Sequence, residues 1–326
     1  MKALVTGGGG FLGKNIVKQL CQRGVDVLSL ARGSYPEVEK MGATSVRFDL
    51  CSRDGLDEIL QGIDVVFHTA AKAGVWGPKE TFWSINVHGT ENLLKAAQQA
   101  GVKKFIYTSS PSAVWNGSDE ENLREEDCPY PTSYLTTYPQ TKAIAEQLVL
   151  QANSDSFATT ALRPHLIWGP EDPHLIPRLL ARAKKLRIVG DGNNKVGLTY
   201  VENAAYAHIL AEKNLEPGSP NAGKAYFITD LQPVVLWEWI NRLLVSVGKK
   251  PIKGKISVKT AYRVGAILEW LYRTFRISGE PKMTRFVAKQ LACAHYYDLT
   301  AAKTDFGYTE LVAPEEAWNQ TIRYFG

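Results

Sequence analysis

The chain has 326 residues, of which 44% are apolar and 22% charged, as in an ordinary globular protein. Its net charge of +5 is spread along the sequence without a Lys/Arg block, so nucleic acid is not an expected partner. The scattered cysteines form no Cys/His cluster, and we therefore expect neither a metal site nor a disulfide framework. Neither a signal peptide nor an apolar stretch of membrane-spanning length appears, which predicts a cytoplasmic protein.

Short apolar runs alternate with helical segments through the first half of the chain. The runs expected to be strands lie at 3–5, 25–30, 46–48, 65–67 and 105–107, and a sixth ends at 161–164. The segments expected to be helices lie at 15–23, 55–60, 86–100 and 139–151. Because strands that alternate with helices form parallel sheets covered on both faces, the pattern predicts an α/β fold with a Rossmann-type, doubly wound parallel sheet.

The pattern changes after Arg163, where helices dominate. Helices are expected at 175–185, 201–210, 237–247 and 262–276, with a further strand at 226–229. We interpret this half as a second, smaller, helix-rich substrate lobe whose pieces interleave with the first domain. The predicted division gives residues 1–164 and 196–230 to the dinucleotide-binding domain, and residues 165–195 and 231–326 to the substrate lobe.

Glycines follow the first predicted strand. Gly7, Gly10 and Gly13 form a G-x-x-G-x-x-G motif between a strand and a helix, which lets backbone N–H groups approach a pyrophosphate. The acidic residue that binds the ribose hydroxyls about 20 residues later in this motif is missing. Arg32 follows the second strand instead, and its guanidinium suits a 2′-phosphate, although it also fits a solvated side chain beside a loop. NADP(H) is therefore the favoured cofactor, with NAD(H) as the alternative.

Tyr138 and Lys142 present a phenol and an ammonium four residues apart. Pro139 fits the first turn of a helix, so both side chains are expected on one face of a helix that begins near Tyr138. A nearby ammonium lowers the pKa of a phenol, and such a pair can donate or accept a proton near neutral pH. The spacing alone also fits two surface residues that merely share a helix face.

The sequence resembles the extended short-chain dehydrogenases/reductases. The motifs appear in that family's order: TGGGGFLG at 6–13, FDL at 48–50, HTAA at 68–71, NVHGTENLLKAA at 86–97, YTSSPSAVW at 107–115, YPQTK at 138–142 and LRPHLIWGP at 162–170. TSYLTTYPQTKAIAE, PHLIPRLL and the C-terminal segment resemble the 3β-hydroxysteroid dehydrogenase branch, whose members act on sterol 4-carboxylates and 2-alkyl-3-oxoalkanoates. The resemblance implies an NAD(P)-dependent oxidoreductase that interconverts a 3-oxo and a 3-hydroxy group on a large apolar, lipid-like substrate.

The resemblance also implies roles for individual residues. Tyr138 would transfer the proton, Lys142 would lower its pKa and hold the nicotinamide ribose, and Ser110 would hydrogen-bond the reacting carbonyl. Ser112 is a second candidate for that hydroxyl, because SSPSAVW is longer than the shorter form of the family. The expected cofactor contacts are Gly7, Gly10, Phe11, Leu12, Gly13, Arg32, Asp49, Leu50, Ala70, Ala71, Tyr138, Lys142 and Pro164, with Asn86 as a structural residue of the central helix.

The substrate lobe offers weaker signals. His165 fits either a partner of a substrate carboxylate or a hydrogen-bonded structural histidine. The helix at 262–276 is amphipathic, with an apolar stripe of Val264, Ile267, Leu268, Leu271 and Phe275 opposite Glu269, Arg273 and Arg276. The stripe is expected either to pack against the lobe or, over 258–276, to form a lid or a peripheral membrane contact. The lobe's aromatic residues favour an apolar substrate: Trp237, Trp239, Trp270, Tyr272 and Phe275.

Two other functions fit parts of the sequence. A nucleotide-sugar epimerase or dehydratase would share the fold and the Ser110, Tyr138 and Lys142 arrangement. A non-catalytic dinucleotide sensor would share the fold, but such proteins typically lack the tyrosine–lysine pair. By analogy with the family, the chain is also expected to form a homodimer.

Overall fold

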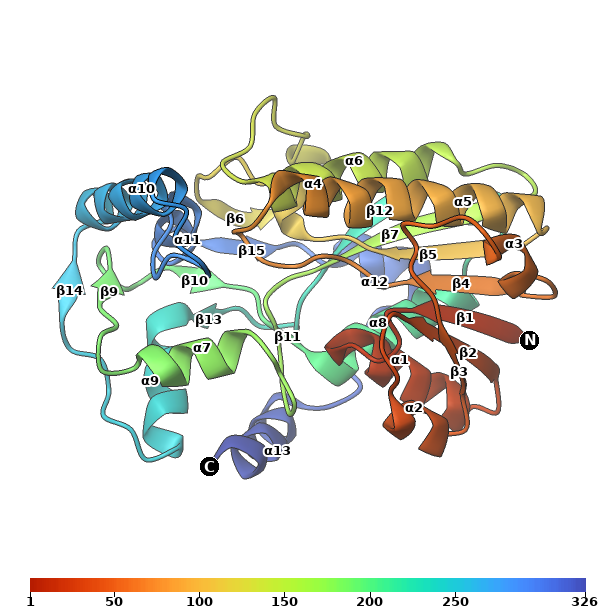
Figure 1. Cartoon of the computed structure of the whole chain (residues 1–326). Coiled ribbons are helices and arrows are strands. Elements are labelled where there is room, and N and C mark those ends of the chain that lie inside the picture. Colours follow the sequence, from red (N-terminus) through yellow and green to blue (C-terminus); the bar gives the residue numbers. More distant parts are fainter.

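The computed structural model describes residues 1–326, and its centre is a seven-stranded sheet whose neighbouring strands are all parallel. The strands are β1 (Lys2–Thr6), β2 (Asp26–Ala31), β3 (Thr44–Arg47), β4 (Val65–His68), β5 (Lys104–Thr108), β7 (Ala158–Pro164) and β12 (Lys224–Ile228). Their order is β12-β7-β5-β4-β1-β2-β3 (Figure 1). The order reverses between β1 and β4, which is where open α/β sheets bind ligands. The predicted Rossmann-type sheet is confirmed.

Two apolar cores cover the two faces of this sheet. The helices on one face are α1 (Phe11–Gln22), α2 (Pro36–Lys40), α8 (Val201–Lys213) and α12 (Thr300–Phe306). The helices on the other face are α3 (Leu56–Ile59), α5 (Gly89–Gln99) and α6 (Thr137–Gln151). Every residue of β4 is buried between them, which explains why its sequence is an unbroken run, VVFH, rather than an alternation.

The helix expected at 86–100 begins earlier and is irregular. The short helix α4 (Lys79–Phe82) leads into a π-helical turn, η1 (Trp83–His88), which continues directly into α5. A π turn widens the helix locally, and such turns are frequent at functional sites. Asn86 lies in this turn with its side chain buried. The turn therefore places the polar side chain of Asn86 in the interior. The helical periodicity of the sequence does not predict this burial.

The substrate lobe lies beyond the carboxyl ends of the strands (Figure 1). Its strands and the connecting ones are β6 (Glu120–Leu123), β8 (Ile167–Trp168), β9 (Ile188–Val189), β10 (Lys195–Val196), β11 (Thr199–Tyr200), β13 (Val234–Val235), β14 (Lys255–Ile256) and β15 (His295–Tyr297). The remaining helical elements are η2 (Pro111–Ala113), η3 (Glu125–Asp127), α7 (Leu175–Arg182), α9 (Leu236–Ser246), α10 (Val258–Thr274), α11 (Arg285–Gln290) and α13 (Pro314–Phe325). The mainly helical lobe has its own apolar core.

The division between the halves differs from the predicted one in two places. Val196 and Leu198 were assigned to the dinucleotide-binding domain but pack in the core of the lobe. Tyr297 and Phe306 were assigned to the lobe but pack in the core beside the sheet. The ring of Tyr297 stacks on Phe227 of β12, with 3.8 Å between the ring centroids. The chain thus crosses between the halves more often than its hydrophobic pattern indicates.

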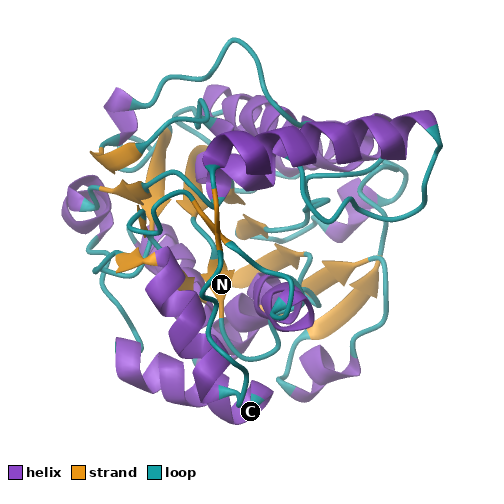
Figure 2. Cartoon of the chain, turned by 90° about the vertical axis from the view of Figure 1, so that its left-hand side faces the viewer, coloured by secondary structure: helices purple, strands orange, loops and turns teal.

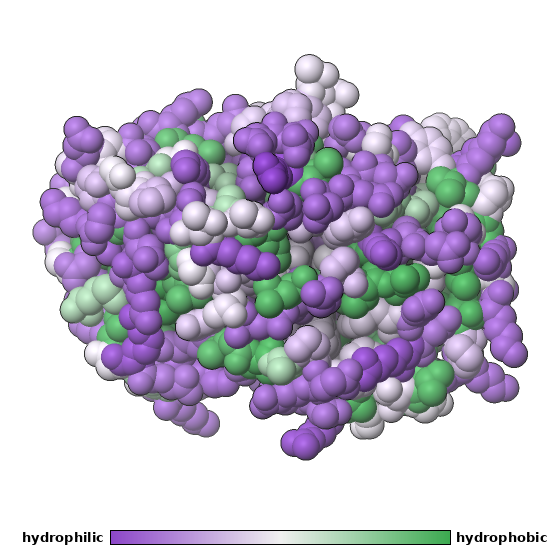
Figure 3. All heavy atoms as spheres, turned by 180° about the vertical axis from the view of Figure 1, so that it is seen from behind, coloured by the Kyte–Doolittle hydropathy of each residue, from purple (hydrophilic) through white to green (hydrophobic).

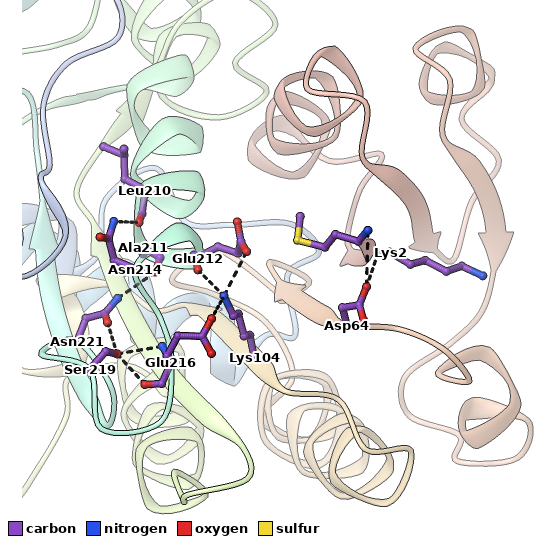
Figure 4. A network of polar contacts seen from close by, with 11 residues as sticks. Lys2, Asp64, Lys104, Leu210, Ala211, Glu212, Asn214, Glu216, Ser219 and Asn221 are labelled. Atoms are coloured by element: carbon purple, nitrogen blue, oxygen red, sulfur yellow. Dashed lines mark hydrogen bonds and ion pairs between the residues drawn. The ribbon is translucent and has the colours of Figure 1, made fainter.

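A polar network lies at the end of the sheet where the strands begin (Figure 4). The ammonium of Lys104, at the start of β5, lies 2.7 Å from Glu216 and 3.7 Å from Glu212 at the end of α8. The backbone N–H of Lys2 donates to Asp64 over 2.7 Å, which joins the starts of β1 and β4. These contacts serve stability and leave the carboxyl ends of the strands free for a ligand.

One face of the molecule is mainly polar. Seen from behind, hydrophilic residues cover most of the molecule, and apolar residues lie between them in small patches (Figure 3). None of the helices combines the length and the apolar character that a membrane span requires.

Candidate active site

The glycine motif forms the turn between β1 and α1. Gly7 has φ = +68°, in the region that favours glycine. A Cβ on Gly8 would come within 2.2 Å of Ser29 Oγ, and a Cβ on Gly13 within 2.2 Å of the carbonyl oxygen of Gly7. Only glycine fits these positions, so the backbone N–H groups that precede α1 stay open to an approaching phosphate. The turn therefore fits the pyrophosphate of a dinucleotide, and Phe11 and Leu12 form the start of α1 directly behind it.

Arg32 follows the last residue of β2, and its side chain is exposed. Tyr35 lies close by, because a Cβ on Gly9 would come within 2.2 Å of its ring. The ring thus covers the glycine turn from the side of Arg32. Sequence reasoning missed Tyr35, although an aromatic residue shortly after the end of the second strand was a usable signal.

Two further pairs of predicted cofactor residues lie at the ends of neighbouring strands. Asp49 follows β3 and is exposed, and its carboxylate accepts a hydrogen bond of 3.0 Å from the backbone N–H of Cys51, while Leu50 is buried. Ala70 and Ala71 follow β4, and the backbone of Ala70 lies 3.0 Å from the position of a Cβ on Gly7. All four therefore border the same end of the sheet as the glycine turn.

Asn86 ties the loop after β4 to the helix α6. Its Oδ1 accepts a hydrogen bond of 2.7 Å from the N–H of Lys72, and its Nδ2 donates to the carbonyl of Lys72 over 3.2 Å. The same Nδ2 donates to Thr141 Oγ1 over 3.0 Å. This fits the structural role that the family resemblance implies.

Tyr138 and Lys142 lie on one face of α6, which begins at Thr137, so that Pro139 stands in the first turn. Tyr138 is partly exposed, whereas only 2% of Lys142 is accessible. The ammonium of Lys142 donates to the carbonyl of Thr108 at the end of β5 and lies 4.2 Å from the ring centroid of Tyr107. The two predicted residues are therefore held at the carboxyl end of the sheet and are not surface neighbours.

Burial is the largest cause of the pKa shifts of Tyr138 and Lys142. It raises the pKa of the Tyr138 phenol, and a hydrogen bond with Ser110 opposes the rise. It lowers the pKa of Lys142 to about 7, against the attraction of Glu146. Lys142 is not among the groups that shift the pKa of Tyr138 here, so the lowering of that pKa by the ammonium stays a prediction.

Ser110 and Ser112 both lie beside this pair. Ser110 caps the short helix η2, and its Oγ lies 2.9 Å from Ser112 Oγ. The N–H of Ser112 also donates to Ser110 Oγ over 3.3 Å. Ser112 is buried, while Ser110 is partly exposed, which favours Ser110 as the hydroxyl that meets a substrate.

A buried ion pair lies behind Lys142. Glu146 comes one turn later on the same face of α6 and binds Arg163 of β7 through contacts of 2.7 Å and 2.9 Å. The hydroxyl of Tyr130 donates to Glu146 over 2.6 Å. Burial alone would raise the pKa of Glu146, but Arg163 outweighs it and keeps the carboxyl ionised. Sequence reasoning missed Glu146, although Tyr138, Lys142 and Glu146 follow one another at the same helical spacing.

His165 lies just beyond Pro164, which is the last residue of β7 and is buried. The Nδ1 atom of His165 lies 2.6 Å from the carbonyl of Gly197, and its ring packs edge-on against His295 at 4.7 Å. Burial and the neighbouring His295 hold the pKa of His165 well below its ordinary value. A neutral, buried ring favours the structural alternative over a partner for a substrate carboxylate.

Helix α10 packs on the lobe through a different face from the predicted one. The face that packs on the lobe contains Ala261, Gly265 and Glu269, not the apolar stripe. A Cβ on Gly265 would come within 2.6 Å of the Thr284 backbone, so glycine permits a close approach of α11. Glu269 was expected on the polar face but is buried, because it accepts hydrogen bonds of 2.7 Å and 2.9 Å from Arg285 at the start of α11.

A groove of about 330 Å³ lies between α10 and the start of α6. Thr137 and Gln140, on either side of Tyr138 in the chain, contribute to its wall. Its apolar lining consists of Val75, Trp76, Phe82, Tyr134 and Leu135, and its cations are Lys79 and Arg273. The guanidinium of Arg273 lies 5.3 Å from the ring centroid of Trp76. The groove therefore offers apolar surface and positive charge at the start of α6, next to Tyr138 in the chain, although Tyr138 itself does not line it.

The assembled groups fit proton transfer to or from an oxygen atom. In the roles that the family resemblance implies, Tyr138 would hold the transferable proton and the Ser110 hydroxyl would stabilise a developing oxyanion. The glycine turn would hold a nicotinamide dinucleotide and Lys142 its ribose, and the bound cofactor would supply or accept the hydride. The chain itself would position the reactants and supply the proton.

Comparison with known proteins identifies the family. A profile of the 3-beta hydroxysteroid dehydrogenase/isomerase family matches residues 4–257. The chain belongs to this family. It is 47% identical over 319 residues to a 2-alkyl-3-oxoalkanoate reductase of Stenotrophomonas maltophilia, with 97% of each chain covered. It is 36% identical over 334 residues to a mouse sterol-4-alpha-carboxylate 3-dehydrogenase, with 99% of this chain and 91% of the relative covered.

The fold is also similar to that of solved structures. The solved structure of MoeE5 in complex with UDP-glucuronic acid and NAD is similar, with a TM-score of 0.75 and 25% identity over 99% of this chain and 98% of that one. As a member of the 3-beta hydroxysteroid dehydrogenase/isomerase family, the protein is an NAD(P)-dependent oxidoreductase that acts on hydroxyl and oxo groups.

Proposed function

We propose that the enzyme interconverts the 3-oxo and 3-hydroxy groups of a long-chain 2-alkyl-3-oxoacid or a sterol-like acid. The observation that carries this proposal is the groove at the start of α6, where five of the twelve lining residues are hydrophobic and three of these are aromatic. Its cations, Lys79 and Arg273, form no ion pair with an acid in the wall. Glu269, the only acid there, is bound by Arg285. The names of the relatives in bacteria and mouse fit the same chemistry, in which the carboxylate is attached to the carbon beside the reacting one, on an apolar body.

The aromatic residues that first suggested this substrate are not the ones that line the groove. Trp237 and Trp239 are buried in the core of the lobe, and Trp270 and Phe275 are exposed. Only Tyr272 lies near the site, with its ring centroid 6.2 Å from that of Trp76. The argument for an apolar substrate therefore rests on Trp76, Phe82 and their neighbours in the groove.

The test is kcat/KM for 3-oxoacids of increasing chain length, with and without a 2-alkyl group, followed by consumption of NADPH. Each buried CH₂ contributes about 0.8 kcal/mol, so kcat/KM should rise by roughly threefold to fourfold per carbon before it levels off. Arg273→Gln should raise KM for the acids and leave the matching neutral ketones unchanged. A flat chain-length profile would exclude the apolar substrate.

For the cofactor, we infer a preference for NADP(H). Arg32 is exposed at the end of β2, and no acidic residue stands there to bind the ribose hydroxyls. A charge-assisted contact contributes about 1.5–3 kcal/mol, so kcat/KM should be tenfold to a hundredfold higher with NADPH than with NADH. Arg32→Asp should invert the preference, and an enzyme that prefers NADH from the outset contradicts the inference.

A nucleotide-sugar epimerase is the second candidate, and the similarity to MoeE5 with its bound UDP-glucuronic acid favours it. An epimerase retains its NAD through purification, whereas a reductase exchanges the cofactor in each turnover. Turnover of UDP-galactose above that of any 3-oxoacid, together with retained NAD, would establish this candidate in place of the reductase.

A further inference from the structure

Exposed apolar side chains gather on α10 and the turn that follows it. Of the ten large hydrophobic side chains exposed on the whole molecule, six lie within residues 258–277. Ile267, Trp270 and Phe275 are 58%, 60% and 64% exposed, and the rings of the last two meet edge-on at 6.3 Å. We call Val264, Ile267, Trp270, Phe275 and Ile277 the α10 apolar face. Such a concentration marks an interaction site, whereas single exposed residues are normal.

A basic groove runs alongside this face. It has a volume of about 1480 Å³ and includes Val264 and Leu268 of α10 in its wall. Seven exposed cations border it, Lys282 among them. We call the other six, which lie in two chain segments, the basic rim: Lys184, Lys185, Arg187, Lys249, Lys250 and Lys253. Pairing of β9 with β14 brings the two segments of the rim together. The only acidic residue in the wall, Glu280, is bound by Arg178 over 2.8 Å, so the rim is not neutralised from within.

The positive charge of the protein is concentrated here. Residues 181–189 and 248–263 carry ten Lys or Arg and no Asp or Glu, while the whole chain has a net charge of only +5. The remainder of the chain is therefore net negative. The even distribution inferred from the sequence was wrong, because folding brings two distant basic segments to one end of the molecule. Figure 2 looks onto this end, with the long helix α10 across its top.

We propose that this end of the protein docks on an anionic lipid membrane, with the α10 apolar face at headgroup level and the basic rim on anionic headgroups. Apolar side chains flanked by Lys and Arg on one surface are the pattern of interfacial membrane binding. An acidic protein partner would match the rim but not a face with Trp, Phe and Ile at its centre. A second copy of the chain would match the apolar face but would place two basic rims together.

The opposite edge of α10 borders the active site. Tyr272 and Arg273 contact Trp76 in the groove beside Tyr138. A docked molecule therefore holds the mouth of that groove near the bilayer surface. This arrangement suits an apolar substrate, but the docking itself follows from α10 and the basic rim alone.

The test is cosedimentation of the full chain with vesicles, either of pure phosphatidylcholine or of an equimolar mixture with phosphatidylglycerol. The protein should bind the mixed vesicles and not the neutral ones, and added salt should weaken binding. Lys184→Glu with Lys185→Glu should weaken it at least about tenfold, since each basic residue near the surface contributes to the attraction. Ile267→Ser with Trp270→Ser should weaken it by about tenfold as well.

The matched control is Leu311→Ser with Tyr324→Ser, which removes exposed apolar side chains elsewhere and should leave vesicle binding unchanged. All variants change exposed residues, and thermal unfolding checks that each is folded. No binding to mixed vesicles, or binding that the α10 and rim variants retain, overturns the proposal. Self-association in the absence of lipid that Ile267→Ser with Trp270→Ser abolishes would assign the face to a second copy instead.

Discussion

The helices α6 and α10 depart from ordinary amphipathic patterning in opposite directions. Helix α6 turns charged residues inward, where Glu146 is fully buried and only 2% of Lys142 is accessible. Helix α10 turns apolar residues outward, where Ile267 and Trp270 are each more than half exposed. Burying a charge costs free energy unless a partner compensates it, and exposing an apolar cluster gives up the gain of burial. Folding alone therefore explains neither the buried charged residues of α6 nor the exposed apolar residues of α10.

The two helices differ in how the departure is compensated. On α6, Arg163 binds Glu146 and the Thr108 carbonyl binds Lys142, so each of the two charged side chains has a partner within the fold. On α10, nothing in the chain covers the apolar face. We infer that α6 serves chemistry inside the molecule and that α10 serves a contact outside it. The following predictions test each side of this comparison.

The largest effect is expected for Tyr138→Phe on α6. Removal of the hydroxyl deletes the proton donor, and loss of acid–base catalysis costs about 100-fold to 10,000-fold in kcat. Cofactor binding, measured by quenching of protein fluorescence, should survive. Tyr296→Phe is the matched control, because that hydroxyl donates to Glu121, outside the groove, and its loss should affect kcat little. Near-normal turnover by Tyr138→Phe would move the acid role elsewhere.

Breaking the ion pair behind Lys142 should destabilise the fold. Glu146→Gln leaves Arg163 buried without its counter-ion, and loss of one partner of a buried pair costs about 3–5 kcal/mol in the free energy of unfolding. The control is Glu91→Gln, which breaks an exposed pair of 2.6 Å with Lys95 within a helix. That change should cost no more than about 0.5 kcal/mol. Equal urea midpoints for the two variants would mean that Glu146 does not stabilise the fold.

The buried carboxyl of Glu120 forms no ion pair, so its ionisation should destabilise the fold, in contrast with the ionised carboxyl of Glu146. Burial raises the pKa of Glu120 to about 7, while Tyr297 donates a hydrogen bond of 2.7 Å to it. Between the ordinary carboxyl pKa and about 7, the folded state keeps a proton that the unfolded chain has lost. Stability should therefore fall as pH rises through that window, by about 1–3 kcal/mol.

Glu120→Gln should reduce this pH dependence, because the amide stays neutral. Asp230, whose pKa burial also raises to about 7, remains in the variant, so the slope should shrink without vanishing. The measurement is the urea midpoint of both proteins on either side of the window. An unchanged slope in Glu120→Gln would show that Glu120 is already ionised when folded.

The sequence could predict what depends on local periodicity and on motifs. The parallel sheet, the glycine turn and the pairing of Tyr138 with Lys142 on one helix face all follow from spacing within a short segment. The position of Glu269 could not be predicted, because its burial depends on Arg285, which α11 brings to it in the folded chain. The same limit applies to the basic rim, whose two halves are distant in the sequence and meet only through β9 and β14.

The smallest effect on stability is expected for Ile267→Ser on α10. Full burial of an isoleucine contributes about 1.5–3 kcal/mol, but this side chain is 58% exposed in the folded protein. Isoleucine and serine have similar helix propensities, so the backbone adds little. The free energy of unfolding should therefore change by only about 0.5 kcal/mol. Ile240 of α9, in the same lobe, is the matched control, since it is 1% exposed and Ile240→Ser should cost more than about 3 kcal/mol. A large loss in Ile267→Ser would mean that the α10 apolar face belongs to the core, and the contrast with α6 would disappear.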